Sequence, residues 1–368
     1  MNNVIPYPIK EGTTELFVYT NKTALKGPSL RRSVPFYNPA MELNRDVSIL
    51  ANQWFLHTSS KHVHILDGLA ASGIRGIRLA HELHGDFDVT INDWNDQSFE
   101  LIQQNIKKNQ AINVSVFQRD LTGLLLERRY HSIDIDPFGS PVYFFDTAVR
   151  SVYNKGIIAC TATDTAALCG VFPKVCFRRY AAWPLHCPSM HEIGLRILLG
   201  CLCREAAKYD RGIEPLLCYT TDYYVRVYAQ IHNGKRAANE SMRYYTGISP
   251  KEIPLSQKIS NIVGPLWLGS IQNKTAIQEI RSLASTTILN TKHQIWRLFD
   301  LLEEEADAPP FFYTINDLSS ILKISPPSMH HVVEKLKKKS FIVTRTHCTP
   351  TGFKTNAPLD VVTEVFKS

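Results

Sequence analysis

The 368 residues are enough for two domains of about 100–200 residues each, and a hydrophobic fraction of 44% is ordinary for a globular protein. No run of 18 apolar residues is present, so we expect no membrane span. Met1–Gly12 lack the apolar core of a secretory signal, so we expect none. The net charge of +7 permits a polyanionic partner without requiring one. Eight cysteines without a C-x-x-C pair favour a reducing, cytoplasmic location.

The N-terminal segment 1–35 is predicted to be irregular because prolines interrupt it, with a polar, basic arm at Lys22–Arg32. From residue 62 to residue 160, apolar runs that end at polar turns alternate with stretches of helical periodicity. This order predicts an α/β fold with a Rossmann-like, mostly parallel sheet. The predicted strands are His62–Asp67, Phe87–Asn92, Val114–Phe117, Ser132–Ile135 and Gly156–Cys160, and the helices before and between them include Met41–Trp54 and Asn95–Asn109.

The sheet is predicted to close with an antiparallel strand. Leu216–Thr221 and Tyr223–Ile231 read as a strand pair joined at Asp222, and the strong helix His191–Lys208 precedes them. A metal site at His186, Cys187 and His191 is disfavoured, because their spacing matches no common zinc pattern.

Carboxylates follow the predicted strands. The first strand ends at Asp67 and runs into a glycine loop, Gly68–Gly76, whose small residues let a cofactor approach the backbone in front of a helix N-terminus. Asp93, Asp120 and Asp136 follow later strands. In a parallel sheet these residues meet at one edge, where ligands bind. The loop is not G-x-G-x-x-G, so a dinucleotide is not favoured.

The C-terminal part is predicted to form a separate domain. A shift in composition near residues 235–250 suggests a boundary between a catalytic domain, 1–245, and a smaller α+β domain, 246–368. There, a helix capped by Thr314, a second helix capped by Ser325 and Pro326, and a hairpin of 341–346 with 352–355 follow a winged-helix-like order. The run Lys337–Lys339 favours nucleic-acid binding by this domain.

The acidic strand ends and the glycine loop together suit S-adenosylmethionine. Asp93 would hold the ribose hydroxyls, Asp120 would accept from the adenine amino group, and Arg45 and Arg75 would hold the methionine carboxylate. Asp67, Gly73 and Leu121 complete the predicted cofactor site.

The turn Asp136-Pro137-Phe138-Gly139 would then receive the methyl group. Taken alone it would be an ordinary turn, but a carboxylate there can accept the hydrogens of an exocyclic amino group and take its proton. Phe138 can stack on a base that has been flipped out of a folded RNA, and Phe36 could cover its other face. Pro137 stiffens the corner.

Several motifs together resemble the tRNA (guanine-N2-)-dimethyltransferase family of archaeal type, from about Phe36 to the C-terminus. They are Phe36-Tyr37-Asn38-Pro39, Asn44-Arg45-Asp46, Asp67 with Gly73-Ile74-Arg75-Gly76, Asp136-Pro137-Phe138-Gly139-Ser140-Pro141, Thr161-Ala162-Thr163-Asp164 and Thr346-His347 to Lys354-Thr355. The resemblance implies dimethylation of the 2-amino group of guanine 26 of tRNA, with Asp136 as the catalytic carboxylate. Some relatives carry a zinc-binding cysteine cluster, whereas the C-terminal part here holds only Cys348, so we predict no metal.

Two alternatives remain open from the sequence. One is an amino-methyltransferase acting on adenine in RNA or DNA, since an acidic residue followed by proline and an aromatic ring serves that chemistry too. The other is a non-catalytic RNA-binding protein on a methylase fold, against which the complete series of strand-end carboxylates argues. We expect tRNA rather than DNA or a membrane as the partner, and the sequence gives no oligomeric state.

Overall fold

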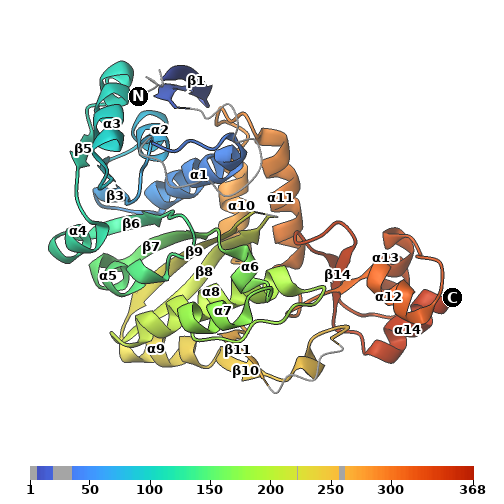
Figure 1. The fold of residues 1–368 in the computed structure, drawn as a ribbon. Coiled ribbons are helices and arrows are strands. Elements are labelled where there is room, and N and C mark those ends of the chain that lie inside the picture. Colours follow the sequence, from blue (N-terminus) through green and yellow to red (C-terminus); the bar gives the residue numbers. More distant parts are fainter. Residues whose placement is uncertain (1–5, 20–34, 222, 257–261) are drawn as a thin grey trace. The chain divides into compact units, whose positions relative to one another are not determined.

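Strands and helices alternate along the chain in a computed structural model that describes residues 6–19, 35–221, 223–256 and 262–368. The main sheet has seven strands in the order β5-β4-β3-β6-β7-β9-β8 (Figure 1). The predicted α/β class and its mostly parallel sheet are confirmed. The strands are β3 (Val63–Asp67), β4 (Phe87–Asn92), β5 (Val114–Phe117), β6 (Tyr130–Ile135), β7 (Val152–Ala162), β8 (Arg211–Thr220) and β9 (Val225–Asn233).

The first five of these strands pair in parallel, and β8 pairs with β9 antiparallel, as predicted. Asp222, the predicted junction of that pair, lies outside the described residues. β3, β4 and β6 are almost wholly buried, which is typical of strands covered on both faces. The connecting helices are α1 (Glu42–Thr58), α2 (Ile74–Glu82), α3 (Asp96–Asn109), α4 (Leu121–Glu127) and α5 (Phe145–Ser151).

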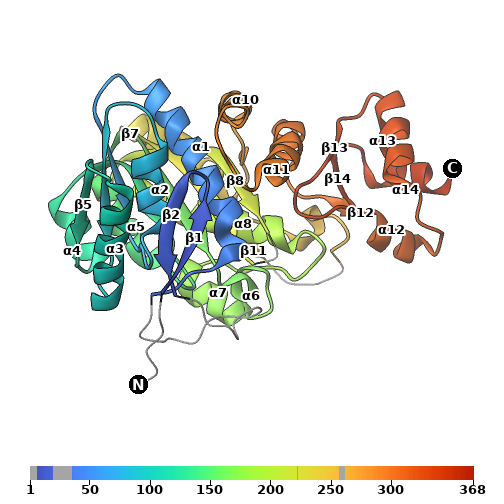
Figure 2. The same cartoon turned by 90° about the horizontal axis from the view of Figure 1, so that it is seen from above.

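The prediction of an irregular N-terminus is wrong for residues 7–18, which form a hairpin of β1 (Tyr7–Glu11) and β2 (Thr14–Val18). Pro8 is tolerated because each strand of a two-stranded sheet has a free edge. Leu16 and Val18 are fully buried, and the hairpin packs on α2 and α3, as Figure 2 shows. The predicted basic arm Lys22–Arg32 lies outside the described residues.

The chain forms two compact units. The first unit comprises Met1–Pro137, Phe144–Cys160 and Glu279–Trp296, and the second comprises Phe138–Tyr143, Thr161–Gln278 and Arg297–Ser368. The domain boundary near residue 245 stays a prediction. None of the described helices is both long enough and apolar enough to cross a membrane.

In the second unit, α8 (Met190–Ala207) is buried on nearly all sides because it packs against both β8 and β11 (Val263–Trp267). The predicted helix His191–Lys208 is thereby confirmed. Further elements before residue 306 are α6 (Thr165–Leu168), α7 (Pro173–Tyr180), α9 (Lys235–Met242), β10 (Tyr245–Ile248), α10 (Lys274–Leu283) and α11 (Lys292–Glu305), the last two of which are shared between the units.

The C-terminal residues are compatible with the predicted winged-helix-like order. Thr314 caps its helix, and β13 and β14 form the predicted hairpin. The second helix, however, begins at Met329 and is capped by Ser328 rather than by Ser325. Two consecutive prolines follow Ser325, and they disfavour the helical conformation in the residues that precede them. The elements are β12 (Tyr313–Thr314), α12 (Ile315–Leu322), α13 (Met329–Lys338), β13 (Val343–Arg345), β14 (Gly352–Thr355) and α14 (Leu359–Lys367).

Candidate active site

The predicted acidic residues lie at one edge of the parallel sheet. Asp67 is the last residue of β3, Asp93 directly follows β4, and Asp136 directly follows β6. Asp120 precedes α4, three residues beyond the end of β5. Since these four strands are parallel neighbours, their carboxyl ends share an edge.

Asp67 and Gly73 shape the loop that leads into α2. One carboxylate oxygen of buried Asp67 accepts the Gly76 N–H at 2.8 Å. Burial raises the pKa of Asp67 to about 7, although the nearby Arg75 favours its ionised form. Gly73 has a φ of 75°, and a Cβ there would lie 2.7 Å from Ile102, so only glycine fits. Both residues set the path of the loop.

Asp93 is oriented by the same loop. Its Oδ2 accepts the Ala71 N–H at 2.7 Å, and its Oδ1 accepts the Asn95 N–H at 3.0 Å. Burial raises the pKa of this carboxyl, which these backbone hydrogen bonds oppose. The Ser98 side chain and the Trp94 backbone also hydrogen-bond to Asp93, so its carboxylate is held firmly at the end of β4.

Asp120 and Leu121 begin α4. Asp120 caps the helix by accepting the Gly123 N–H at 3.0 Å. Leu121 is buried, and its methyl groups lie 2.9 Å from where a Cβ on Gly68 would be. Leu121 therefore packs directly against the backbone of the glycine loop, which brings α4 beside that loop.

Arg75 contacts Asp136. This buried guanidinium donates through Nη2 to Asp136 Oδ2 and through Nη1 to the Ser48 hydroxyl, and its Nε lies 3.6 Å from Asp134 Oδ1. A charge-assisted hydrogen bond of this kind fixes the carboxylate at the end of β6. Sequence reasoning missed Ser48 and Asp134, although Asp134 precedes Asp136 by two residues and so shares its face of the strand.

Arg45 is held by a residue that sequence reasoning also missed. Its guanidinium forms a two-pronged ion pair with buried Glu11 of β1, one bond measuring 2.7 Å, and Tyr37 donates its hydroxyl to Glu11 at 3.0 Å. Burial by itself raises the pKa of Glu11, but Arg45 and Arg78 together hold it below its usual range. Arg45 thus anchors the N-terminal hairpin to α1.

The corner after β6 is fastened to the strand end that carries Thr163 and Asp164. The Gly139 N–H donates to Thr163 Oγ1 at 2.7 Å, and the Thr163 N–H donates to the Gly139 carbonyl at 2.9 Å. Asp164 accepts from Tyr180 at 2.6 Å and pairs with Arg179 at 2.8 Å. These bonds leave the Phe138 ring 69% exposed. The corner therefore presents an aromatic face to solvent.

The comparisons with known proteins agree over nearly the whole chain. The family described as N2,N2-dimethylguanosine tRNA methyltransferase matches residues 21–367. The tRNA (guanine(26)-N(2))-dimethyltransferase of Pyrococcus furiosus is 38% identical over 98% of each chain, and that of Methanobrevibacter smithii is 35% identical over 98% of this chain and 97% of its own. The chain belongs to the N2,N2-dimethylguanosine tRNA methyltransferase family.

A solved structure supports the same family. Trm1 from Pyrococcus horikoshii, determined in complex with S-adenosyl-L-methionine, superposes with a TM-score of 0.86 at 32% identity, covering 98% of this chain and 99% of that one. The family match includes residues of both compact units, so both units belong to the region that the methyltransferase family shares.

One cluster of metal-ligand type lies elsewhere on this methyltransferase. Within the part of the chain that the structure describes, His62, His64 and Asp88 are the grouped candidates. They lie at the amino ends of β3 and β4, opposite the edge that carries Asp67. Asp88 Oδ2 lies 2.8 Å from His62 Nε2 and 2.7 Å from His64 Nδ1, and hydrogen bonds that His62 donates to Asp88 and to Asp86 raise the pKa of His62.

Proposed function

We propose that the protein transfers methyl groups from S-adenosyl-L-methionine to the 2-amino group of guanine 26 in tRNA. The family and the printed activities of its full-length relatives support this function. The main structural support for the proposed active site is the Arg75–Asp136 pair at the end of β6, beside the glycine loop. The pair supports the assignment because parallel sheets of this kind bind ligands at the carboxyl ends of their strands, where Asp136 lies.

The loop and strand ends fit the cofactor. We propose that Asp93 accepts the ribose hydroxyls, because backbone N–H groups already orient its carboxylate. Asp120 and Leu121 would border the adenine, and Gly73 would keep the loop backbone open to close approach. Arg45 stays a predicted cofactor residue, and its pairing with Glu11 assigns it at least an anchoring role. When bound, the sulfonium supplies an electrophilic methyl group.

Asp136 would act as the general base. The 2-amino nitrogen of guanine is a poor nucleophile, because its lone pair is conjugated into the ring. Asp136 would accept a hydrogen of this amino group and take its proton as the new N–C bond forms and the S–C bond breaks. Arg75 would hold Asp136 in position, while Pro137 limits the movement of the corner.

Phe138 would stack on the flipped guanine. Its exposed ring offers one face, and stacking on an aromatic side chain contributes about 1–3 kcal/mol per base. Half-buried Phe36 is proposed for the other face of the base. We further propose that residues 246–368 contribute to tRNA binding, since Lys337 and Lys338 are exposed on α13.

A cytoplasmic location is proposed as well. All eight cysteines lie within the described residues and are free thiols, which fits a reducing compartment.

The function is tested by incubating the protein with unmodified tRNA and methyl-labelled cofactor, followed by digestion to nucleosides. We expect labelled N2,N2-dimethylguanosine from position 26. N6-methyladenosine in its place would refute the assignment in favour of an adenine methyltransferase. Asp136→Asn should reduce kcat by about 100-fold or more, the range of general-base catalysis, whereas Asp360→Asn, on the exposed start of α14, should not. Full activity of Asp136→Asn would remove Asp136 from the mechanism.

Arg75→Lys separates positioning from cofactor binding. Lysine keeps the charge but loses the fork that reaches Ser48 and Asp136 together. If Arg75 positions the carboxylate, kcat falls while the KM for the cofactor changes little. A raised cofactor KM at unchanged kcat would instead place Arg75 on the cofactor.

A further inference from the structure

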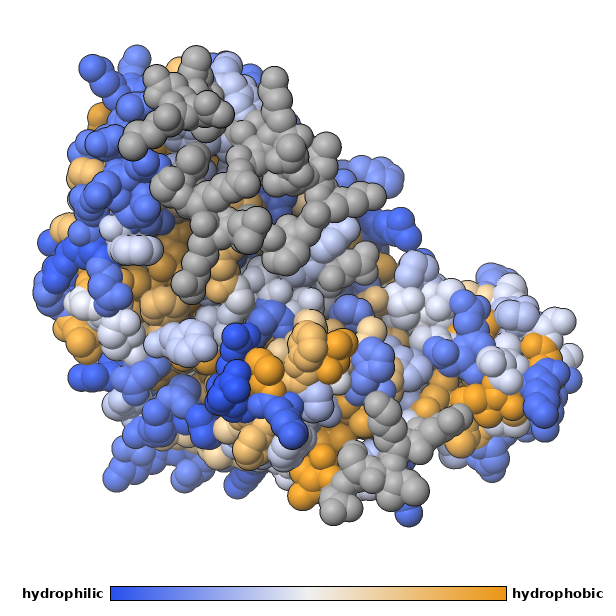
Figure 3. Space-filling model, in the orientation of Figure 1, coloured by the Kyte–Doolittle hydropathy of each residue, from blue (hydrophilic) through white to orange (hydrophobic). Residues whose placement is uncertain are grey.

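A group of exposed aromatic and apolar residues surrounds α7 in the second unit. Phe172 precedes the helix, Phe177 lies on it, and Trp183 follows it. With Val171, these side chains remain between 39% and 56% exposed. On the face drawn in Figure 3, hydrophobic and strongly hydrophilic residues lie side by side over the region where Figure 1 places α6 and α7. We call this group, with the cations described next, the α7 surface.

Two of the aromatic rings form a stacked pair. The Phe177 and Trp183 ring centroids lie 4.4 Å apart, with 16° between the planes. Stacking holds the rings in one orientation, so the pair presents an outer ring face as a fixed platform rather than two mobile side chains. Such a platform accepts the face of any nucleobase and does not depend on its sequence.

Cations accompany the platform. Lys174 and Arg178 are exposed on the same helix, one turn apart. A hollow of about 470 Å³ adjoins Arg178, lined by Val142, Tyr143, Arg178, Arg179, Cys201, Arg204 and Glu205. Two of its arginines are paired, Arg179 with Asp164 and Arg204 with Glu205, so Arg178 together with Lys174 on the same helix gives this surface its positive charge. Aromatic faces beside arginines are the combination that binds single-stranded or flipped RNA, since the cations track phosphates and the rings stack on bases.

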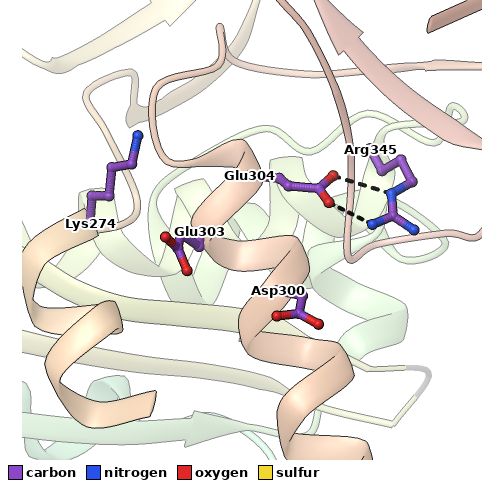
Figure 4. Close-up of a pocket in the computed structure, with 5 residues that line it drawn as sticks. All are labelled: Lys274, Asp300, Glu303, Glu304 and Arg345. Atoms are coloured by element: carbon purple, nitrogen blue, oxygen red, sulfur yellow. Dashed lines mark hydrogen bonds and ion pairs between the residues drawn. The ribbon is translucent and has the colours of Figure 1, made fainter. Parts of the chain in front are cut away.

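A second hollow of this unit is lined by more acidic than basic groups. Asp300, Glu303 and Glu304 line it together with Lys274 and Arg345 (Figure 4). Arg345 is paired with Glu304, and Lys274 is paired with a neighbouring aspartate at 2.7 Å. Three carboxylates against two cations suit phosphate less well than the exposed Lys174 and Arg178 of the α7 surface, so charge complementarity favours the α7 surface as an RNA contact.

The α7 surface is tied to the corner that carries Phe138. Arg179 and Tyr180, the last residues of α7, both bind Asp164, and Thr163 makes two hydrogen bonds to Gly139. A short chain of contacts thus runs from α7 to the residue after Phe138. RNA docked on α7 would lie in the same compact unit as the ring proposed to stack on guanine.

We propose that the α7 surface binds the tRNA segment that flanks the target guanine, with an unpaired base extending the Phe177–Trp183 stack and with Lys174 and Arg178 contacting phosphates. This inference rests on the proposed function, because it takes tRNA as the substrate. It assigns to α7 the role of delivering the substrate to the catalytic corner.

The test uses the full chain, unmodified tRNA and four variants. Trp183→Ala and Phe177→Ala should each weaken tRNA binding about tenfold, the range of one stacking contact. Arg178→Ala should lower the slope of log affinity against log salt by about one. The matched control is Arg236→Ala, which removes a highly exposed arginine on α9 and should change neither the tRNA affinity nor its salt dependence.

Methylation kinetics supply the second readout. The α7 variants should raise the KM for tRNA and leave kcat and cofactor affinity unchanged, which a misfolded protein would not do. If wild type methylates tRNA but the α7 variants match it in affinity, salt slope and KM, the inference is wrong and the proposed function stands. If wild type methylates no tRNA, the proposed function itself fails. Variants that alter the sedimentation coefficient at unchanged tRNA affinity would make the surface a protein interface and overturn the proposal.

Discussion

Replacing Lys354 with methionine should destabilise the second unit strongly. Lys354 lies on β14 and is 1% exposed, with its Nζ 3.0 Å from Glu192 Oε1 and 3.4 Å from Glu305 Oε2. Glu192 also pairs with Arg196 at 2.8 Å, and Glu305 with His347. Methionine keeps most of the side-chain volume, so the change removes the charge while leaving little cavity.

The expected loss can be worked out in two ways. Burial by itself raises the pKa of Glu192, but Lys354 and then Arg196 lower it to about 2. A fall from the usual 4.5 to about 2 corresponds to roughly 3 kcal/mol of stabilisation of the ionised form. Removing one partner of a buried ion pair costs about 3–5 kcal/mol. Arg196 remains beside Glu192, so we expect a loss of about 3 kcal/mol in the free energy of unfolding.

The loss should depend on pH. A carboxylate whose folded-state pKa is lowered contributes stability above its unfolded pKa and loses it as the pH falls toward the folded value. Without Lys354, Glu192 and Glu305 take up protons more easily when folded. The difference in the free energy of unfolding between wild type and Lys354→Met should therefore be largest at pH 7 and become smaller as the pH falls below about 5.

Urea unfolding followed by tryptophan fluorescence measures this effect. A loss of about 3 kcal/mol should lower the midpoint of the second unit by about 1 M, for a slope near 3 kcal/mol/M. Lys337→Met, on the exposed side of α13, is the control and should leave the midpoint unchanged. A loss below about 1 kcal/mol, or one that stays constant from pH 8 to pH 4, would refute the electrostatic reasoning.

Three further outcomes are expected. Gly76→Ala should lower stability by about 1–3 kcal/mol in thermal unfolding, because its Cβ would lie 2.6 Å from a buried side chain of β4. His62→Gln should remove a small stabilisation of the folded state, because Asp88 and Asp86 stabilise the His62 imidazolium. This contribution is present below pH 6.5 and fades as the pH rises through the raised pKa of His62, which a series of melting temperatures at different pH values checks. Tyr180→Phe removes a 2.6 Å hydrogen bond to Asp164 and should cost about 1–3 kcal/mol in urea unfolding.

The strand-end carboxylates could be predicted because they depend on local signals. Apolar runs such as Ser132–Ile135 mark strands, and parallel pairing then places the following residues at one edge. The helix cap at Thr314 likewise depends on residues within one turn. The partners of the predicted residues could not be read in this way. Glu11 meets Arg45 across 34 positions, and Arg75 meets Asp136 across 61, so only the fold brings them together.

The C-terminal motif shows the same limit. The sequence placed Thr346-His347 and Lys354-Thr355 among the residues that carry the family resemblance, but spacing alone gave them no role. In the structure Thr346, His347 and Lys354 all contact Glu305, at the end of α11. The motif therefore closes a buried charge network at the end of α11.

The pairing of Arg75 with Asp136 changes the charge of the proposed site. Arg75 is surrounded by Asp134 and Asp136, and Asp67 lies near enough to be affected by all three. The pKa of about 7 leaves Asp67 partly protonated at neutral pH, while these neighbouring carboxyls give the proposed site an acidic character. An acidic site suits a cofactor whose sulfonium is positive. Transfer of the methyl group leaves a neutral thioether, so the same carboxylates attract the spent cofactor less, which favours its exchange before a second methyl is added.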